Sequence, residues 1–216
     1  MPLHPRTGAI RRSPIIRGYL PTDRRDVYEV CLRTAAAGGD ATGIYRDPDL
    51  MGDNFAGPYL HLEPELAFVL DDGGRVVGYV LGTSDTAAFA VAFRRAWLPR
   101  VADRHPAPAG TPSGPDEEMA ALLHRPERMI VPELRDYPAH LHIDLLPDYQ
   151  RAGYGRALLL TFLGAARRAG AERVHLGMLT ENTGARAFYD RLGFHQIDVP
   201  DPGPLSYLGR STEADG

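Results

Sequence analysis

Six consecutive residues, Gln-Arg-Ala-Gly-Tyr-Gly at positions 150–155, have types and a spacing that could bind phosphate. They lie between a predicted strand, residues 140–146, and a predicted helix, residues 156–169. The first N–H groups of a helix have no partner within it, and the helix dipole adds positive potential there. Gly153 and Gly155 would let a ligand approach the backbone closely. The turn is a candidate phosphate site, although Gly-x-Gly before a helix is also typical of a plain tight turn.

A second group of polar residues, His140, His142 and Asp144, alternates along the predicted strand and therefore shares one face of it. Side chains two positions apart on a strand are separated by about 7 Å, which is too wide for three of them to bind one small cation. No metal site is predicted from them. They are interpreted as the polar wall of a cleft, and His142 and Asp144 become candidates for contact with a substrate.

The elements downstream of the turn complete a longer pattern. A strand at residues 173–179 leads to Asn182, and the residues that follow form a short helix ending in Phe-Tyr-x-x-Leu-Gly-Phe. The order strand, Gln-x-x-Gly-x-Gly, helix, strand, Asn and then this helix resembles the GNAT superfamily of acetyl-CoA-dependent N-acetyltransferases. The matching block runs from about Tyr137 to Val199. The resemblance implies an α/β (α+β) fold with a mixed, mostly antiparallel twisted sheet, splayed central strands and flanking helices.

Shorter motifs elsewhere are similar to the acetyltransferase-like domain at the C-terminus of eukaryotic protein O-GlcNAcases and to its free-standing bacterial relatives. They are Gly-Pro-Tyr-Leu at 57–60, Leu-Glu-Pro-Glu at 62–65, Tyr-Pro at 137–138 with Asp144, and Leu-Gly-Arg at 208–210. The eukaryotic domain lacks an intact Gln-x-x-Gly-x-Gly. In this chain the turn is intact, and that difference from the eukaryotic domain favours cofactor binding.

The N-terminal half is expected to build the outer strands and the first helices. Its predicted features are a strand at 15–19, a helix capped by Thr22 or Asp23 that runs to Ala37, an irregular or partly helical stretch at 40–64 with a turn at 54–59, and a hairpin of strands 66–70 and 75–82 around Asp-Asp-Gly-Gly. Residues 1–13 and those after Arg210 are expected to be loose. A last pair of strands is predicted at 195–199 and 205–209.

The chain is expected to be one domain, residues 1–216, with a helical insertion at about 85–135 and a cofactor-binding core at about 137–199. Within the insertion, Phe89, Phe93 and Trp97 recur at helical spacing. They are interpreted as the core of the insertion, with the alternative that Trp97 or Tyr59 lines the substrate cleft. A proline-rich loop and a helix at 116–124 follow. We expect the insertion to cover the acceptor side of the site.

Composition excludes several classes of function. The net charge of −4 gives no electrostatic case for binding nucleic acid, and all 24 basic residues are Arg, which excludes a lysine Schiff base. The single cysteine, Cys31, cannot form an internal disulfide and is interpreted as buried core. No apolar run approaches the roughly 20 residues of a membrane span. A cytoplasmic location is predicted, and a homodimer is left open.

The resemblance also implies cofactor contacts. Pyrophosphate would bind the N–H groups of the turn, and the pantetheine arm would add alongside the strand that ends at Leu145. An N–H near Leu145 would polarise the thioester carbonyl. Arg151 and Arg156 either contact phosphates or are solvated, and Asn182 either holds the arm or caps a helix. The residues implied to bind acetyl-CoA are Leu145, Leu146, Gln150, Arg151, Ala152, Gly153, Tyr154, Gly155, Arg156, Asn182, Phe188 and Tyr189.

The implied chemistry is direct attack of a neutral amine, belonging to a small molecule or a peptide, on the thioester. Tyr189 matches the family's acid, and Asp144 is the candidate base or a substrate contact, with Glu133 or Glu63 acting through water as the fallback. Candidate substrate contacts are Tyr59, Trp97, Tyr137, His142 and Asp144. A non-catalytic module that binds CoA or another ligand is the alternative. A Rossmann or P-loop protein is disfavoured because neither Gly-x-Gly-x-x-Gly nor Gly-Lys-Ser/Thr is present.

Overall fold

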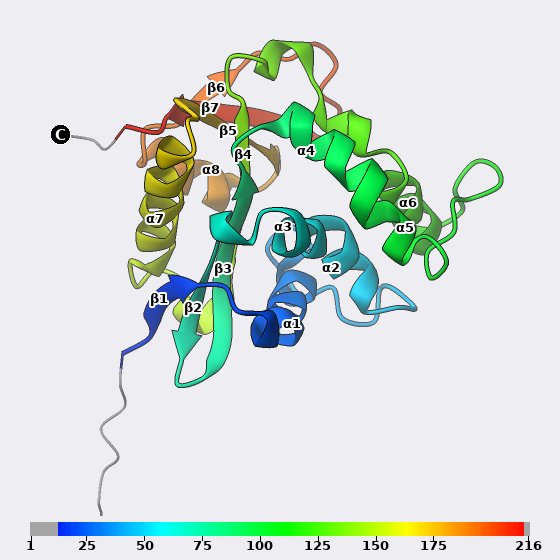
Figure 1. Cartoon of the computed structure of the whole chain (residues 1–216), viewed down its shortest axis with the longest axis horizontal. Helices are drawn as coiled ribbons and strands as arrows, with labels where there is room; N and C mark the ends of the chain where they lie inside the picture. The colour runs from blue at the N-terminus through cyan, green and yellow to red at the C-terminus, as the bar shows by residue number, and fades with distance from the viewer. Residues whose placement is uncertain (1–12, 214–216) are drawn as a thin grey trace, which may run out of the picture.

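The computed structural model describes residues 13–213, and a seven-stranded sheet forms its centre (Figure 1). The strands lie in the order β1-β2-β3-β4-β5-β7-β6. Every neighbouring pair is antiparallel except β4 with β5, which is parallel. The strands are β1 (Ile15–Gly18), β2 (Ala67–Asp72), β3 (Arg75–Thr83), β4 (Ala139–Leu145), β5 (Arg173–Leu179), β6 (His195–Ile197) and β7 (Leu205–Ser211). This is the mixed, mostly antiparallel sheet that the sequence predicts.

Helices cover both faces of the sheet. Figure 1 shows α7 on one side of the central strands and α1, α2 and α3 on the other. The helices are α1 (Arg24–Thr34), α2 (Asp49–Phe55), α3 (Gly57–Leu62), α4 (Thr86–Ala92), α5 (Leu98–Val101), α6 (Pro115–Leu123), α7 (Tyr154–Arg168) and α8 (Thr183–Asp190). A π-helical stretch, Phe93–Trp97, joins α4 to α5, and short 3₁₀ turns lie at Pro21–Asp23, Pro64–Leu66, Pro126–Met129, Pro132–Leu134 and Pro147–Tyr149.

The apolar stripe of α7 fixes that helix on the sheet. Leu158, Leu159 and Phe162 recur at helical spacing and are fully buried. Phe162 packs directly over Gly82 of β3, where an added Cβ would come within 2.5 Å of the aromatic ring. Burial of each such side chain contributes about 1.5–3 kcal/mol. This packing holds the N-terminus of α7 beside the end of β4.

The two central strands separate soon after they begin. β4 and β5 pair only at Ala139 with Val174 and at His140 with His175. β4 continues beside β3 as far as Leu145. Beyond the two shared positions, the edge of β4 that faces β5 carries no strand. The splayed central strands expected from the sequence are therefore confirmed.

The open edge of β4 carries a definite set of backbone groups. The Leu146 N–H donates to the Val77 carbonyl at 3.0 Å, so even-numbered positions of β4 bond to β3. Successive residues of an antiparallel strand direct their N–H and C=O groups to opposite sides. Leu141 lies next to the last position paired with β5, so the N–H groups of Ile143 and Leu145 are the ones that point into the gap between the splayed strands.

Three boundaries differ from the sequence prediction. The turn expected at 54–59 is wrong, because α2 and α3 occupy residues 49–62 and Pro58 lies in the first turn of α3, where proline is tolerated. The first helix ends at Thr34, three residues before the predicted Ala37. Thr212 is buried and bonds residues 171 and 172, so the chain is not loose directly after Arg210. Residues 1–12 and 214–216 lie outside the described chain.

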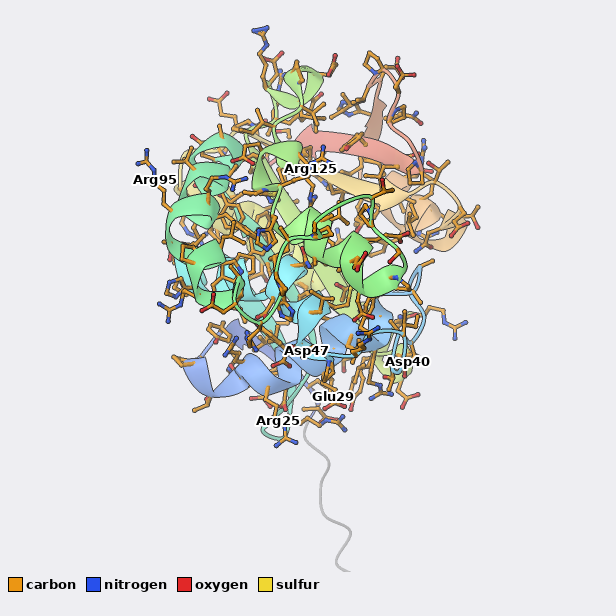
Figure 2. All side chains as sticks on the ribbon, turned by 90° about the vertical axis from the view of Figure 1, so that its right-hand side faces the viewer. Arg25, Glu29, Asp40, Asp47, Arg95 and Arg125 are labelled. Atoms are coloured by element: carbon orange, nitrogen blue, oxygen red, sulfur yellow. The ribbon has the colours of Figure 1, made fainter. Side chains whose placement is uncertain are left out.

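The insertion packs through its aromatic stripe. The rings of Phe89 and Tyr59 stack with centroids 4.5 Å apart, and the Trp97 indole N–H donates to the Asp53 carbonyl at 2.9 Å. Phe89, Phe93 and Trp97 are all buried. The stripe therefore belongs to the core that joins the insertion to α2 and α3. Figure 2 shows charged side chains of both signs over this side of the molecule, with Arg95 and Arg125 on the insertion.

Candidate active site

The turn at residues 150–156 contains two residues with positive φ. Arg151 has a φ of 60°, and Gly153, the N-cap of α7, has a φ of 88°. The first backbone bond of α7 runs from the Ala157 N–H to the Gly153 carbonyl at 3.1 Å. In the described chain, no hydrogen bond uses the backbone N–H groups of residues 151–156. Several donors therefore stand free at the positive end of a helix dipole, as phosphate binding requires.

Side chains around the turn leave those donors accessible. A Cβ added at Gly153 would meet no atom within 4 Å, so space is open there. Arg151, Ala152 and Arg156 are exposed, and neither arginine forms an ion pair within residues 13–213. Both guanidinium groups can therefore reach phosphates near the turn. Tyr154 is half-buried and packs against the core.

Residues of β4 and α8 also support the turn by packing against it. A Cβ at Gly155 would lie 3.3 Å from the Phe188 ring and 3.6 Å from Leu145, so glycine allows α8 and β4 to approach here. The Gln150 amide donates to the Leu145 carbonyl at 2.9 Å. Gln150 thus orients the end of β4, while the Leu145 N–H stays directed into the gap. The Leu146 N–H is committed to β3, and its side chain is buried core.

A cavity of about 680 Å³ opens on the α1 side of the splayed strands. Its walls combine β4 and β5 with α1, α2, α6 and the segment after α6. Among residues 13–213, Asp144 is the only carboxylate that lines it and Arg128 the only guanidinium. The insertion therefore covers this face of β4. Lining residues include Cys31, Thr34, Tyr45, Asn54, Phe55, Tyr59, Met119, Leu122, Arg128, His140, His142, Asp144, His175, Met178 and Tyr207.

Asp144 is held in this wall by a tyrosine from the neighbouring strand. The Tyr79 hydroxyl donates to Asp144 Oδ2 at 2.7 Å, because the two residues lie opposite each other in the β3–β4 ladder. Burial raises the pKa of the Asp144 carboxyl, and the hydrogen bond from Tyr79 offsets part of that rise. The carboxylate is therefore more basic than an exposed one, which suits it to accept a proton from an amine.

Tyr189 lies on α8 with its ring among Phe188 and Phe194. The residue is buried, yet its hydroxyl has no hydrogen-bond partner in the described chain and is not sealed from solvent. Burial raises the pKa of Tyr189, and the charge of Asp144 raises it further. The phenol is therefore protonated at neutral pH and near enough to Asp144 to sense its charge. Such a group can donate a proton to a leaving sulfur.

A chain of hydrogen bonds fixes the proton positions of the histidines in the cavity. The Thr86 hydroxyl donates to the Pro138 carbonyl at 2.7 Å, so it accepts from Nδ1–H of His140, also at 2.7 Å. His140 Nε2 then accepts from the Tyr59 hydroxyl at 2.7 Å. The Tyr59 oxygen in turn accepts from Nε2–H of His142 at 3.1 Å. Donor counting therefore leaves Nδ1 of His142 as an unprotonated acceptor.

The chain of bonds keeps His142 neutral and oriented. Burial lowers the pKa of His142 to about 4, with the charge of Arg128 as a second cause, and burial lowers the pKa of His140 as well. Nδ1 of His142 has no partner in the described chain and is accessible to solvent. This series of hydrogen bonds ends at the Pro138 carbonyl, which cannot take up a proton. The series therefore orients His142 and does not carry protons away from it. His142 can thus accept a hydrogen bond from a ligand.

Three predicted site residues lie elsewhere or are otherwise engaged. Trp97 does not line this cavity, because it is core of the insertion. Tyr137 does not line it either, and its hydroxyl pairs with His195 Nε2 at 2.7 Å. Asn182 caps α8, accepting from the Ala185 N–H at 3.0 Å and donating to the Ala37 carbonyl at 3.3 Å. The capping interpretation of Asn182 therefore accounts for both of its polar atoms.

The fallback bases and the cysteine also have other surroundings. Glu63 binds the Thr83 hydroxyl and the Ser84 N–H, and Glu133 is exposed; neither lines the cavity. Burial raises the pKa of the Cys31 thiol to about 12, so it stays neutral. Within residues 13–213, no group of three or more His, Cys, Asp or Glu side chains is placed to hold a metal ion. No helix of this part of the chain is long and apolar enough to cross a membrane.

Comparison with known proteins places this geometry in a family. A family model described as the acetyltransferase (GNAT) family matches residues 119–194. The crystal structure of a protein named SsHAT is 60% identical, with a TM-score of 0.91, and the match covers 94% of this chain and 100% of that one. The chain belongs to the GNAT acetyltransferase family.

Two further relatives of this GNAT acetyltransferase show how far the likeness extends. Protein O-GlcNAcase of Rattus norvegicus is 26% identical over 200 residues, which cover 91% of this chain and 22% of the relative. The chain thus spans only about a fifth of that protein. The crystal structure of the ribosomal-protein-S18-alanine N-acetyltransferase from Escherichia coli is 19% identical, with a TM-score of 0.51, and covers 94% of this chain and 96% of that one. At that identity the likeness shows the fold alone.

As a GNAT acetyltransferase, the chain is an acyltransferase with acetyl-CoA as its acetyl donor. Its own atoms fit that cofactor. The free N–H groups of residues 151–156 suit a pyrophosphate, and the unpaired edge of β4 suits an amide-containing arm. Acetyl-CoA supplies a thioester, an acetyl group already activated for transfer.

Sequence reasoning missed three residues of the site. Tyr79, which binds Asp144, could be found only from the register of β3 against β4. Thr86, which sets the tautomer of His140, looks like an ordinary residue at a helix start. Arg128 lies in a segment with no periodic pattern, so no local signal assigns it to the cavity.

Proposed function

We propose that this chain is an N-acetyltransferase that transfers acetyl from acetyl-CoA to the primary amine of a small-molecule or peptide acceptor by direct attack in a ternary complex. The observation that carries the proposal is the position of Asp144, a half-buried carboxylate in the wall of a cavity that borders the unpaired edge of β4. A cytoplasmic location belongs to the same proposal.

Asp144 and His142 receive the amine in this proposal. Their side chains lie on one face of β4, both line the cavity, and each offers an acceptor to an N–H group. An alkylammonium is mostly protonated at neutral pH, so it first loses one proton to solvent and binds as the neutral amine. When that amine attacks the thioester, its nitrogen loses a second proton to become an amide. Asp144 takes that proton, and its raised pKa makes it a better base for this step than an exposed aspartate.

Tyr189 supplies a proton to the sulfur as the carbon–sulfur bond breaks and the carbon–nitrogen bond forms. The Leu145 N–H, directed into the gap, is the donor for the carbonyl oxygen. After the reaction Asp144 holds one extra proton and Tyr189 lacks one. Because the Tyr189 pKa is far above that of a carboxyl, return of the proton from Asp144 to Tyr189 is downhill. This return restores both side chains, and the one proton released to solvent in each turnover is the one that the ammonium loses before it binds. Nothing specific favours a non-catalytic module.

Asp144→Asn tests the proposal, with Asp148→Asn as the control because Asp148 is an exposed carboxylate just after β4. A base must be ionised to act, so kcat/KM should rise with pH through the Asp144 pKa. In Asp144→Asn, kcat/KM should fall about 100-fold or more, and the remaining activity should no longer rise with pH through the Asp144 pKa. The affinity for CoA should be unchanged. The measurement is CoA thiol release with a panel of primary amines across pH. An unaltered pH–rate profile would exclude Asp144 as the base.

A further inference from the structure

The acceptor cavity holds one positive and one negative side chain that do not pair with each other. Asp144 accepts a hydrogen bond from the Tyr79 hydroxyl. Arg128 lies over the Phe55 ring, with its guanidinium carbon 5.8 Å from the ring centroid, and donates from Nε to the Leu122 carbonyl at 3.4 Å. No ion pair joins the two residues. The cavity therefore separates its two charges.

The guanidinium of Arg128 is available to a ligand. Its two terminal nitrogens make no hydrogen bond to any residue between 13 and 213, and no carboxylate of that range pairs with it. Arg128 is exposed at the mouth of the cavity, and its charge reaches Tyr59, His142 and Tyr207. A planar guanidinium binds carboxylate or phosphate through two parallel hydrogen bonds.

The Asn54 amide lies at the same end of the cavity. Asn54 is only 3% exposed, and its Oδ1 is the one buried side-chain atom of the described residues without a hydrogen-bond partner. Its Nδ2 donates both protons, to the carbonyls of Leu50 and Met119 at 3.2 Å each, so the amide cannot be turned round. The Oδ1 oxygen is sealed from solvent, so it is part of the packing at this end of the cavity and not a contact for a ligand.

Asn54 and Arg128 both connect the end of α2 to α6. Asn54 reaches Met119, while Arg128 joins Phe55 to Leu122. The remaining lining between this end and Asp144 is mainly apolar or neutral. A volume of about 680 Å³ is that of a small-molecule site. The cavity is thus complementary to a molecule with an amine at one end and an anion at the other.

Resting on the proposed function, we infer that the acceptor is a small primary amine that carries an anionic group at its far end. Asp144 and His142 bind the amine, and Arg128 binds the anion. The anion is a carboxylate or a phosphate, which share this chemistry. A neutral alkylamine would lack the second contact.

The test compares three acceptors of equal length, 6-aminohexanoate, 6-aminohexanamide and hexylamine, with the full chain and acetyl-CoA. The carboxylate should have a kcat/KM about 10-fold or more above the amide and the alkylamine. Arg128→Gln should remove that preference by raising KM with kcat unchanged. Arg125→Gln is the matched control, because Arg125 is an exposed arginine three residues away that does not line the cavity. Figure 2 shows Arg125 on this side of the molecule.

One further arm completes the experiment. A comparison of kcat/KM for 3-aminopropylphosphonate and 4-aminobutanoate shows whether a phosphate-like group or a carboxylate is the preferred anion. Equal kcat/KM for the carboxylate and the amide, or a preference that survives Arg128→Gln, would overturn the inference while the acetyltransferase proposal stands. Absence of CoA binding would overturn both.

Discussion

The cofactor turn and the acceptor cavity are built in opposite ways. The turn, residues 150–156, is a short exposed segment whose function lies in free backbone N–H groups. The cavity is assembled from β4, β5, α1, α2, α3 and the insertion, and its function lies in side chains. The turn therefore depends on local backbone conformation, whereas the cavity depends on long-range contacts. Each region should fail in its own way when one residue is changed.

The largest effect is expected from Gly153→Val, which attacks the turn alone. A β-branched residue is strained at a φ of 88°, although space for the side chain is open. The N–H groups should lose their arrangement, and CoA affinity should fall about 100-fold or more in calorimetry, with the fold intact by circular dichroism. Gly153→Asn is the matched variant, because asparagine tolerates this φ, and it should retain most of the affinity. Equal losses in both variants would show that backbone conformation is not the reason.

A second prediction concerns Tyr189, which does not line the cavity but lies near enough to Asp144 to sense its charge. Tyr189→Phe should lower kcat about 100-fold and leave the CoA dissociation constant unchanged, because the hydroxyl acts mainly in the transition state. Stability should change little, since the hydroxyl makes no hydrogen bond in the described chain. Tyr137→Phe is the control, because that hydroxyl binds His195 outside the cavity. Full turnover by Tyr189→Phe would remove this residue from the mechanism.

The difference between the regions also explains what could be predicted from the sequence. The strands around Gly82 and Leu145, the turn and α7 follow from periodicity and glycine placement, which are local signals. Asp144 could be proposed because it lies on the predicted strand. Its partner Tyr79 could not, because the contact depends on β3–β4 register. Arg128 lies in a segment without a pattern, and only the folded chain brings it to the cavity.

The two helices at residues 49–62 were missed for a related reason. Gly57 and Pro58 are typical of a turn, and the sequence indicated one there. In the fold, Gly57 begins α3 and is in close contact with Trp97, so that a Cβ would lie 2.5 Å from the indole. Tertiary packing thus requires glycine at a position that local propensity assigns to a turn. Trp97 was a candidate substrate contact for the same reason. The residues that bury it, Asp53 and Gly57, are distant in the sequence, so no local pattern predicts the contact.

A third prediction disturbs the cavity and leaves the turn intact. Tyr59→Phe removes the donor to His140 Nε2 and the acceptor for His142 Nε2–H. A buried acceptor left unpaired costs about 1–3 kcal/mol in the free energy of unfolding. CoA affinity should not change, whereas kcat/KM should fall several-fold because the His142 tautomer is no longer fixed. Urea unfolding and acceptor kinetics check both parts, and an unchanged kcat/KM would show that tautomer fixation has no role in the reaction.

The smallest effect is a pH dependence of stability that belongs to the cavity alone. Burial lowers the pKa of His142 to about 4 in the folded chain, against about 6.5 when unfolded. Between these values the unfolded chain binds the extra proton and the folded chain does not, so stability falls as pH falls. From pH 7 to pH 5 this residue alone should cost about 1–2 kcal/mol. His142→Gln should lessen that loss in urea unfolding, while His61→Gln, whose ring lies outside this cavity, should not. If the wild type, His142→Gln and His61→Gln all lost the same stability between pH 7 and pH 5, His142 would be gaining its proton in the folded state. Its Nδ1 would then be a donor, and not the acceptor proposed for the amine.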